Sequence, residues 1–176
     1  MKNVIWKKRR GEIMNKYLQP MVSLEIGATK GTYNYQTAKK VFNGGLDQDF
    51  EKWGIIFSAV TPRALLAIDK IAITGKFNHF FGETAEELER RRITGSPQFL
   101  KFFQDHPAIL FNKEEVLASF TILTAKDQEV AKDLSNTYVG CVSIHDATKM
   151  YACIHPFECD RDWRANSYRA LRPAYL

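Results

Sequence analysis

The chain has 176 residues, 45% of them hydrophobic and twelve of them phenylalanine, which favours one folded domain with a substantial core and excludes a disordered chain. Its net charge of +5 is concentrated, because residues 1–16 hold six Lys or Arg and one Glu, whereas the other residues hold 19 charges of each sign. The sequence predicts neither a transmembrane helix nor a signal peptide, since no apolar run is long enough. An odd number of cysteines favours a reducing compartment over a disulfide framework.

Residues 1–16 are predicted to form a flexible basic arm, and residues 17–176 a single folded domain. In the arm, a tryptophan directly precedes four consecutive cations. Such a tryptophan can lie at the lipid headgroup layer while the cations contact anionic lipid, or the cations can contact RNA phosphates. A third interpretation is a solvated tail that aids solubility. We expect a membrane-binding or nucleic-acid-binding site formed by Lys2, Trp6, Lys7, Lys8, Arg9 and Arg10.

The first predicted elements after the arm are a strand and a short helix. Residues 21–28 alternate between polar and apolar, and the inward face of this strand would carry Val22, Leu24 and Ile26. Asn34 is a suitable N-cap for a helix over residues 35–43, which a Gly-Gly pair ends. The apolar stretch of residues 64–77 predicts a further strand, and residues 78–82 a Phe-rich loop.

Residues 84–92 begin with a capping box and predict a helix. Residues 93–112 contain a glycine and two prolines and predict a long connection. Exposed aromatic residues on such a loop would mark an interaction site, whereas the competing interpretation is that they pack onto the core. The residues for which we expect a role in self-association or partner binding are Phe99, Leu100, Phe102 and Phe103.

Later in the chain, residues 115–125 predict a strand, residues 127–135 a polar helix, and residues 161–171 a helix that a proline stops. Between these helices lies the clearest hairpin in the sequence, with strands at residues 139–145 and 150–155. Together the elements predict an α+β fold: one domain with a mostly antiparallel sheet and short flanking helices.

The hairpin region holds all three cysteines and two of the four histidines, namely Cys141, His145, Cys153, His155 and Cys159. Zinc sites usually bring paired Cys-x2–4-Cys knuckles, which this spacing lacks. A two- or four-residue loop would place Cys141 and Cys153 on opposite faces, whereas a three- or five-residue loop would place them on one face. Our interpretation is that the cysteines are buried, reduced and metal-free. No cofactor and no catalytic residue is predicted, since no histidine has a nucleophile at a diagnostic spacing.

Two stretches show a distinctive order of elements. Residues 21–77 contain the strand MVSLEIGATKGTYNY, the helix QTAKKVFN and the segment Lys52-Trp53-Gly54; residues 97–130 lead from the aromatic loop into KEEVLASFTILTAKDQEV. In this order of elements and in its size the chain resembles the matrix proteins of rhabdoviruses, especially the compact ones of plant viruses. The resemblance covers about half the chain and rests on the pattern and order of the elements. No Pro-Pro-x-Tyr motif is present, so recruitment of host budding machinery is not expected.

The resemblance implies a non-enzymatic structural protein that condenses the viral nucleoprotein–RNA complex, binds an anionic membrane surface and forms homo-oligomers, with no small-molecule substrate. It implies a place in the virion, in the host cytoplasm and at the inner face of a host membrane. Two alternatives remain open. One is a nucleic-acid-binding accessory protein, for example one encoded by a phage, which would need basic residues on the folded surface. The other is a zinc-dependent enzyme built on the hairpin, which would need an open metal position.

Overall fold

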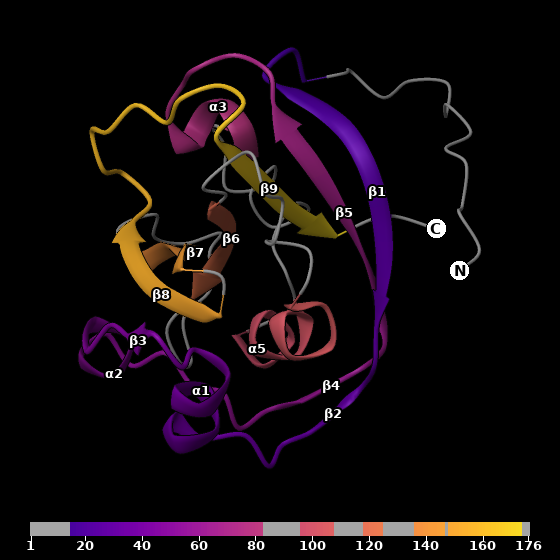
Figure 1. The fold of residues 1–176 in the computed structure, drawn as a ribbon, viewed down its shortest axis with the longest axis vertical. Helices are drawn as coiled ribbons and strands as arrows, with labels where there is room; N and C mark the ends of the chain where they lie inside the picture. Colours follow the sequence, from indigo (N-terminus) through magenta and orange to yellow (C-terminus); the bar gives the residue numbers. More distant parts are fainter. Residues whose placement is uncertain (1–14, 83–95, 108–117, 125–135, 147, 174–176) are drawn as a thin grey trace.

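The computed structural model describes residues 15–82, 96–107, 118–124, 136–146 and 148–173. A seven-stranded sheet curves around one side of helix α5 (Figure 1). Neighbouring strands are antiparallel except at the β6–β9 and β3–β8 pairs, which confirms the predicted α+β fold with a mostly antiparallel sheet. The spatial order is β1 (Leu18–Ile26), β5 (Ala64–Ile71), β9 (Tyr168–Pro173), β6 (Ala118–Thr124), β7 (Thr137–Asp146), β8 (Lys149–Pro156) and β3 (Gly45–Leu46).

Strand β1 confirms the first predicted strand and begins earlier, at Leu18. It pairs with β5 along its length, with a bulge between Pro20 and Val22. Because successive residues of a strand point to opposite faces, Ile26 is fully buried while Val22 and Leu24 are partly buried on the same face. The predicted inward face is therefore confirmed.

The chain just before β1 is held against helix α3 (Phe77–Phe81). Asn15 donates from Nδ2 to the carbonyl oxygens of His79 at 2.7 Å and Phe80 at 3.2 Å. The ring of Tyr17 stacks on that of His79 with centroids 4.7 Å apart. Asn15, which we had assigned to the flexible arm, is thus part of the folded domain, and residues 1–14 lie outside the described residues.

Helix α1 (Tyr35–Val41) forms where the capping signal predicts it, since the side chain of Asn34 accepts a hydrogen bond from the Thr37 N–H at 2.9 Å. A short helix, α2 (Asp49–Lys52), follows β3. Between α1 and β3 the chain passes so close to Tyr151 of β8 that a Cβ on Gly44 would lie 2.5 Å from its ring. Only glycine fits there, and β3 reaches the edge of β8 as a result.

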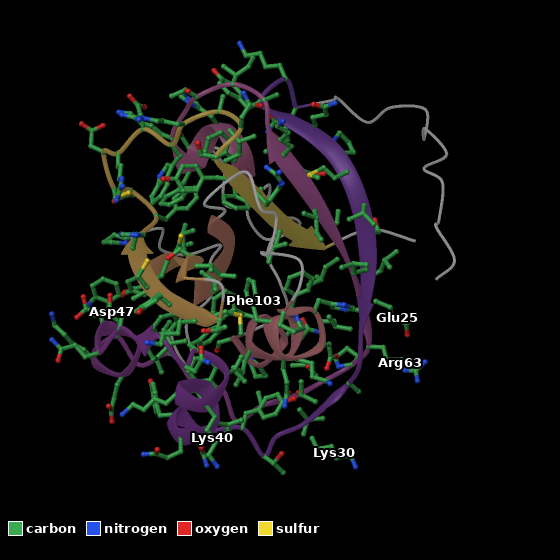
Figure 2. All side chains as sticks on the ribbon, in the orientation of Figure 1. Glu25, Lys30, Lys40, Asp47, Arg63 and Phe103 are labelled. Carbon is green, nitrogen blue, oxygen red and sulfur yellow. The ribbon has the colours of Figure 1, made fainter. Side chains whose placement is uncertain are left out.

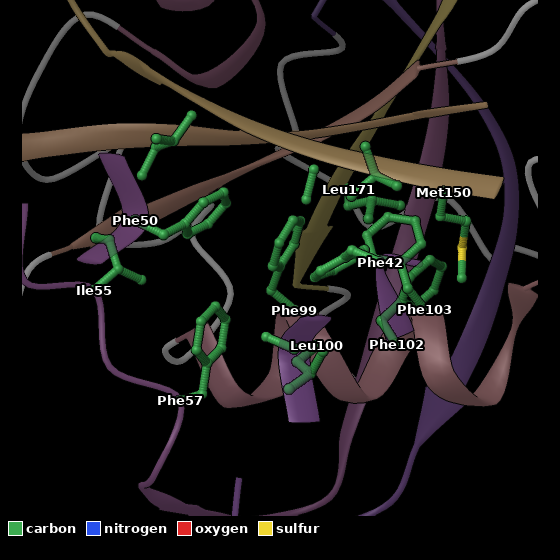
Figure 3. Packing of buried hydrophobic residues seen from close by; sticks show 14 of the residues in the cluster. Phe42, Phe50, Ile55, Phe57, Phe99, Leu100, Phe102, Phe103, Met150 and Leu171 are labelled. Carbon is green, nitrogen blue, oxygen red and sulfur yellow. The ribbon is translucent and has the colours of Figure 1, made fainter. Parts of the chain in front are cut away.

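Helix α5 (Ser96–Asp105) stands where we predicted an aromatic loop, so that prediction is wrong. Pro97 lies in its first turn, where a missing N–H breaks no helical hydrogen bond. The four residues proposed as a partner surface are completely buried and pack with Phe42 and Phe50 under the sheet (Figure 3), as the competing interpretation had it: Phe99, Leu100, Phe102 and Phe103.

Helix α3 packs on the other face of the sheet, where a second cluster contains Phe77, Phe80, Phe81, Phe157 and Trp163. The predicted loop over residues 78–82 is therefore wrong. The predicted strand over residues 64–77 ends at Ile71. Beyond it Ile73 is 45% exposed, so the apolar residues there do not continue the strand.

The predicted C-terminal helix over residues 161–171 is also wrong, because strand β9 occupies this part of the chain. It lies between β5 and β6 and contributes side chains to the hydrophobic clusters on both faces of the sheet. Leu171 belongs to the cluster around α5 and Ala170 to the cluster around α3. Pairing with two strands outweighs the helix propensity of its residues. The helices predicted over residues 84–92 and 127–135 lie outside the described residues.

Candidate functional site

A two-stranded sheet, β2 (Thr29–Lys30) with β4 (Val60–Thr61), forms a lip at the end of the molecule where α1 lies (Figures 1 and 2). In its antiparallel register Lys30 lies opposite Val60. Val60 is the most exposed large hydrophobic side chain of the described residues, at 77%. Four exposed cations lie on the lip and on the neighbouring helix. We call this surface the basic lip and define it as Lys30, Lys39, Lys40, Val60 and Arg63.

A buried pair of threonines fixes the two strands of the lip. The hydroxyls of Thr29 and Thr61 lie 2.9 Å apart, and Thr29 also donates to the Ala59 carbonyl at 2.7 Å. The backbone N–H of Thr61 donates to Thr29 Oγ1 at 3.0 Å. Both threonine side chains point inward. Because successive residues of a strand point to opposite faces, Lys30, which follows Thr29, and Val60, which precedes Thr61, point outward.

Helix α5 supports the lip from inside the molecule. Gln98, which is fully buried, donates from Nε2 to the carbonyl of Pro62 at 3.0 Å. The hydroxyl of Ser96 donates to the carbonyl of Ile56. The lip is therefore fixed to a rigid helix rather than carried on a free loop, although residues 55–59 themselves form neither helix nor strand.

The charges of the basic lip are only weakly compensated. Arg63 forms an ion pair with Glu25 at 3.4 Å, but both side chains are exposed, and such pairs contribute little. Lys39 and Lys40 lie in the last turn of α1, where they also complement the helix dipole. An exposed apolar side chain opposite a lysine, as Val60 lies opposite Lys30, suits an anionic lipid surface, while exposed cations alone suit phosphates.

The basic lip was not among the sites predicted from the sequence. The predicted arm site lies outside the described residues, and the predicted aromatic site is buried: the first is Lys2, Trp6, Lys7, Lys8, Arg9 and Arg10, the second Phe99, Leu100, Phe102 and Phe103. The sequence does contain one indication of a basic surface, because residues 28–41 include Lys30, Lys39 and Lys40 and no acidic residue. The exposure of Val60 had no such signal, because it depends on the pairing of β4 with β2.

A second candidate site lies on the hairpin β7–β8. A bulge between Ile144 and Asp146 sets a register in which Ile144 pairs with Met150, leaving five residues between them. Cys141 therefore lies directly opposite Cys153, on the same face of the sheet. Of the two arrangements that the sequence allowed, the opposite-face one is excluded. The side chain of His145 lies outside the described part of the structure.

The contacts of this pair are unequal. Cys141 is 3% exposed and belongs to the cluster around α3, whereas Cys153 is half-buried at the rim of that cluster. Two residues along β8, His155 places Nε2 3.6 Å from the sulfur of Cys153. The His155 ring meets Trp163 edge-on at 5.4 Å between centroids. We call Cys141, Cys153 and His155 the thiol site.

The pKa values of the two cysteines in the thiol site are shifted in opposite directions. The thiol of Cys141 donates a hydrogen bond to Cys153, and this bond, opposed by burial and reinforced by His155, lowers the Cys153 pKa to about 5. The same hydrogen bond, together with burial, raises the pKa of Cys141 well above its ordinary value. Among charged neighbours, Asp47 acts to raise the pKa of Cys153 and Arg161 acts to lower that of Cys141. The arrangement therefore favours the thiolate of Cys153 over that of Cys141.

Two further features bear on function. Within the described ranges, no three His, Cys, Asp or Glu side chains gather as they would to hold a metal ion. Nor does any helix of the described part have the length and apolar character needed to cross a membrane. No protein-family model, curated protein or solved structure matches this chain.

Proposed function

We propose that this protein is a non-enzymatic structural protein of the viral matrix type, which binds an anionic membrane surface, condenses a nucleoprotein–RNA complex and self-associates. Its places of action would be the virion, the host cytoplasm and the inner face of a host membrane. The observation that supports this best is the basic lip, where an exposed Val60 lies beside Lys30 at an end of the molecule that carries further cations (Figure 2).

The basic lip gives the folded domain a surface that complements the N-terminal arm. Each cation near an anionic membrane contributes about 1 kcal/mol, and an apolar side chain adds contact with the acyl boundary. The arm holds five of its six cations within residues 1–10, together with Trp6. Two weak contacts on one chain reinforce each other, because binding of the first raises the effective concentration of the second.

Co-sedimentation with vesicles tests this proposal. The full chain should bind vesicles containing phosphatidylserine, with an affinity that falls as salt rises, and should not bind vesicles of phosphatidylcholine alone. Lys30→Gln removes one cation and should weaken binding about fivefold, which corresponds to ~1 kcal/mol. Val60→Ser should weaken it further. Arg164→Gln is the matched control, because Arg164 is exposed on the connection between β8 and β9, away from the lip.

A deletion of residues 1–10 distinguishes the contribution of the arm to vesicle binding from that of the basic lip. The deletion should remove most of the binding while the melting temperature hardly changes, because the first residue anchored to the domain in the described structure is Asn15. Binding that is unchanged by Lys30→Gln, Val60→Ser and the deletion would overturn the membrane proposal.

The runner-up is a nucleic-acid-binding accessory protein, and one observation favours it: Lys30, Lys39 and Lys40 are exposed cations of the folded surface, beyond the arm. Both functions predict binding that weakens with salt. Trp6→Ala and Val60→Ser distinguish them, since loss of an apolar group should weaken vesicle binding, whereas RNA binding through phosphate contacts alone should stay within about twofold. RNA binding without vesicle binding would favour the runner-up.

A further inference from the structure

The thiol site is not explained by surface binding. Use as a small apolar residue accounts for the burial of a cysteine, but not for an ionisable side chain placed at its sulfur. Here one cysteine is buried, the other is half-buried, and the half-buried one has the Nε2 atom of His155 3.6 Å from its sulfur. This asymmetry is the arrangement of an attacking thiol and a resolving thiol.

We propose that Cys153 is a thiol–disulfide exchange site for small disulfides of the glutathione type, and that Cys141 is its resolving thiol, so that exchange closes a cross-strand disulfide between β7 and β8. The inference concerns a modification site and does not depend on the proposed membrane function.

The geometry permits the bond. Residues directly opposite each other on antiparallel strands have Cα atoms about 4.5–5.5 Å apart, and disulfides span Cα separations of about 4.4–6.8 Å. The register pairs Cys141 with Cys153 directly, so their Cα separation falls in the range that a disulfide spans.

Exposure decides which thiol reacts first. An incoming disulfide can reach Cys153 at the rim of the cluster, whereas Cys141 is covered by it. The hydrogen bond from Cys141 and the contact with His155 both favour the thiolate of Cys153, which is the nucleophilic form. Burial and the interaction with Cys153 raise the pKa of Cys141, which favours its protonated form while Cys153 is a thiolate.

The exchange balances in two steps. The Cys153 thiolate attacks one sulfur of the small disulfide, a mixed disulfide forms, and one small thiolate leaves. The Cys141 sulfur then attacks the sulfur of Cys153, and the second small thiol leaves with the proton that Cys141 carried. Two protein thiols are thereby oxidised, and one small disulfide is reduced to two thiols.

Cys159 provides an internal reference. It is half-buried and belongs to the rim of the same cluster, as Cys153 does. Its backbone N–H donates to the Pro156 carbonyl in the turn after β8, so it lies outside the paired part of the hairpin. Exposure alone therefore predicts equal reaction at Cys153 and Cys159, while the thiol site predicts reaction at Cys153.

The test is incubation of the native full chain with oxidised glutathione at neutral pH, followed by intact mass and peptide mapping. We expect loss of two hydrogen atoms and a Cys141–Cys153 linkage. Cys141→Ser should stop at a glutathione adduct on Cys153, and Cys159→Ser should behave as the unmodified protein. Cys153 should react at least about tenfold faster than Cys159.

Several results would overturn the proposal. They are equal reaction at Cys153 and Cys159, a linkage that includes Cys159, or oxidation of Cys141 only after the protein has been unfolded. Peptide mapping of the unsubstituted protein gives the answer even if a cysteine variant fails to fold. Circular dichroism of each variant identifies such failure.

Discussion

Gln98 of α5 and Pro62, which follows β4, are joined by a hydrogen bond of 3.0 Å from the amide Nε2 to the backbone carbonyl. The link connects the central helix to the basic lip. The other end of the same amide, Oε1, is buried and has no hydrogen-bond partner among the described residues. The side chain thus has one satisfied group and one unsatisfied group, and substitutions can separate their effects.

Gln98→Leu should change the free energy of unfolding by less than about 1 kcal/mol, because it removes the donor and the unsatisfied oxygen together. Gln98→Glu should cost at least about 2 kcal/mol near neutral pH, since it places a buried carboxylate against the Pro62 carbonyl. Urea unfolding measures both. The decrease in the free energy of unfolding caused by Gln98→Glu should become smaller as the pH falls and the carboxylate gains a proton. Equal stability of the two variants would contradict the assigned amide orientation.

The phenylalanines of α5 are predicted to dominate the stability of the domain. Phe103 is fully buried and packs edge-on against Phe99 and Phe102, with centroids 5.3 and 5.1 Å away (Figure 3). Phe103→Ala should lower the free energy of unfolding by about 3–5 kcal/mol, through lost transfer energy and a cavity. Val60→Ser is the control and should stay within about 0.5 kcal/mol. A Phe103→Ala protein of unchanged stability would mean that these residues do not form the core.

The reactivity of Cys153 should depend on pH in a direction set by its surroundings. Its pKa is lowered from 9.0 to about 5, so the thiolate, and with it the rate of alkylation by iodoacetamide, should persist from alkaline pH down to about 5 and fall below it. The groups that bear on it are Cys141, His155 and Asp47. Cys141→Ala removes the hydrogen-bond donor and should move the midpoint upward. In urea, the midpoint should lie near the ordinary value.

Purified protein is expected to contain no stoichiometric zinc. The hairpin lacks paired Cys-x2–4-Cys knuckles, and among the described side chains no three His, Cys, Asp or Glu gather as a metal ion would require. Elemental analysis of protein prepared without chelators measures the content. One zinc per chain that is lost on Cys153→Ser would contradict this expectation and would favour the alternative of a zinc-dependent enzyme.

Elements with a local signal could be predicted from the sequence. The alternation of β1, the Asn34 cap of α1 and the hairpin β7–β8 each depend on neighbouring residues, and all three form as expected. The same holds for the fold class, which follows from strands interrupted by short helices.

Elements whose structure depends on residues distant in the sequence could not be predicted. Pro97 suggested a break, yet it begins α5, because the first turn of a helix tolerates proline. The residues of β9 favour a helix by propensity and become a strand only between β5 and β6. In the thiol site, a single bulge after Ile144 decides whether two cysteines meet, and nothing in the sequence marks that bulge.

The position of β9 has a consequence for how the protein is made. It follows the other strands of the seven-stranded sheet in sequence, yet it lies between β5 and β6. A ribosome therefore releases the β1–β5 pair and the β6–β7–β8 group before the strand that joins them exists. Each half then carries an unpaired edge in the nascent chain, which is a template for wrong pairing. Folding of this sheet should be completed only after β9 has left the ribosome, and the yield of soluble protein should depend on chaperones that cover these edges during translation.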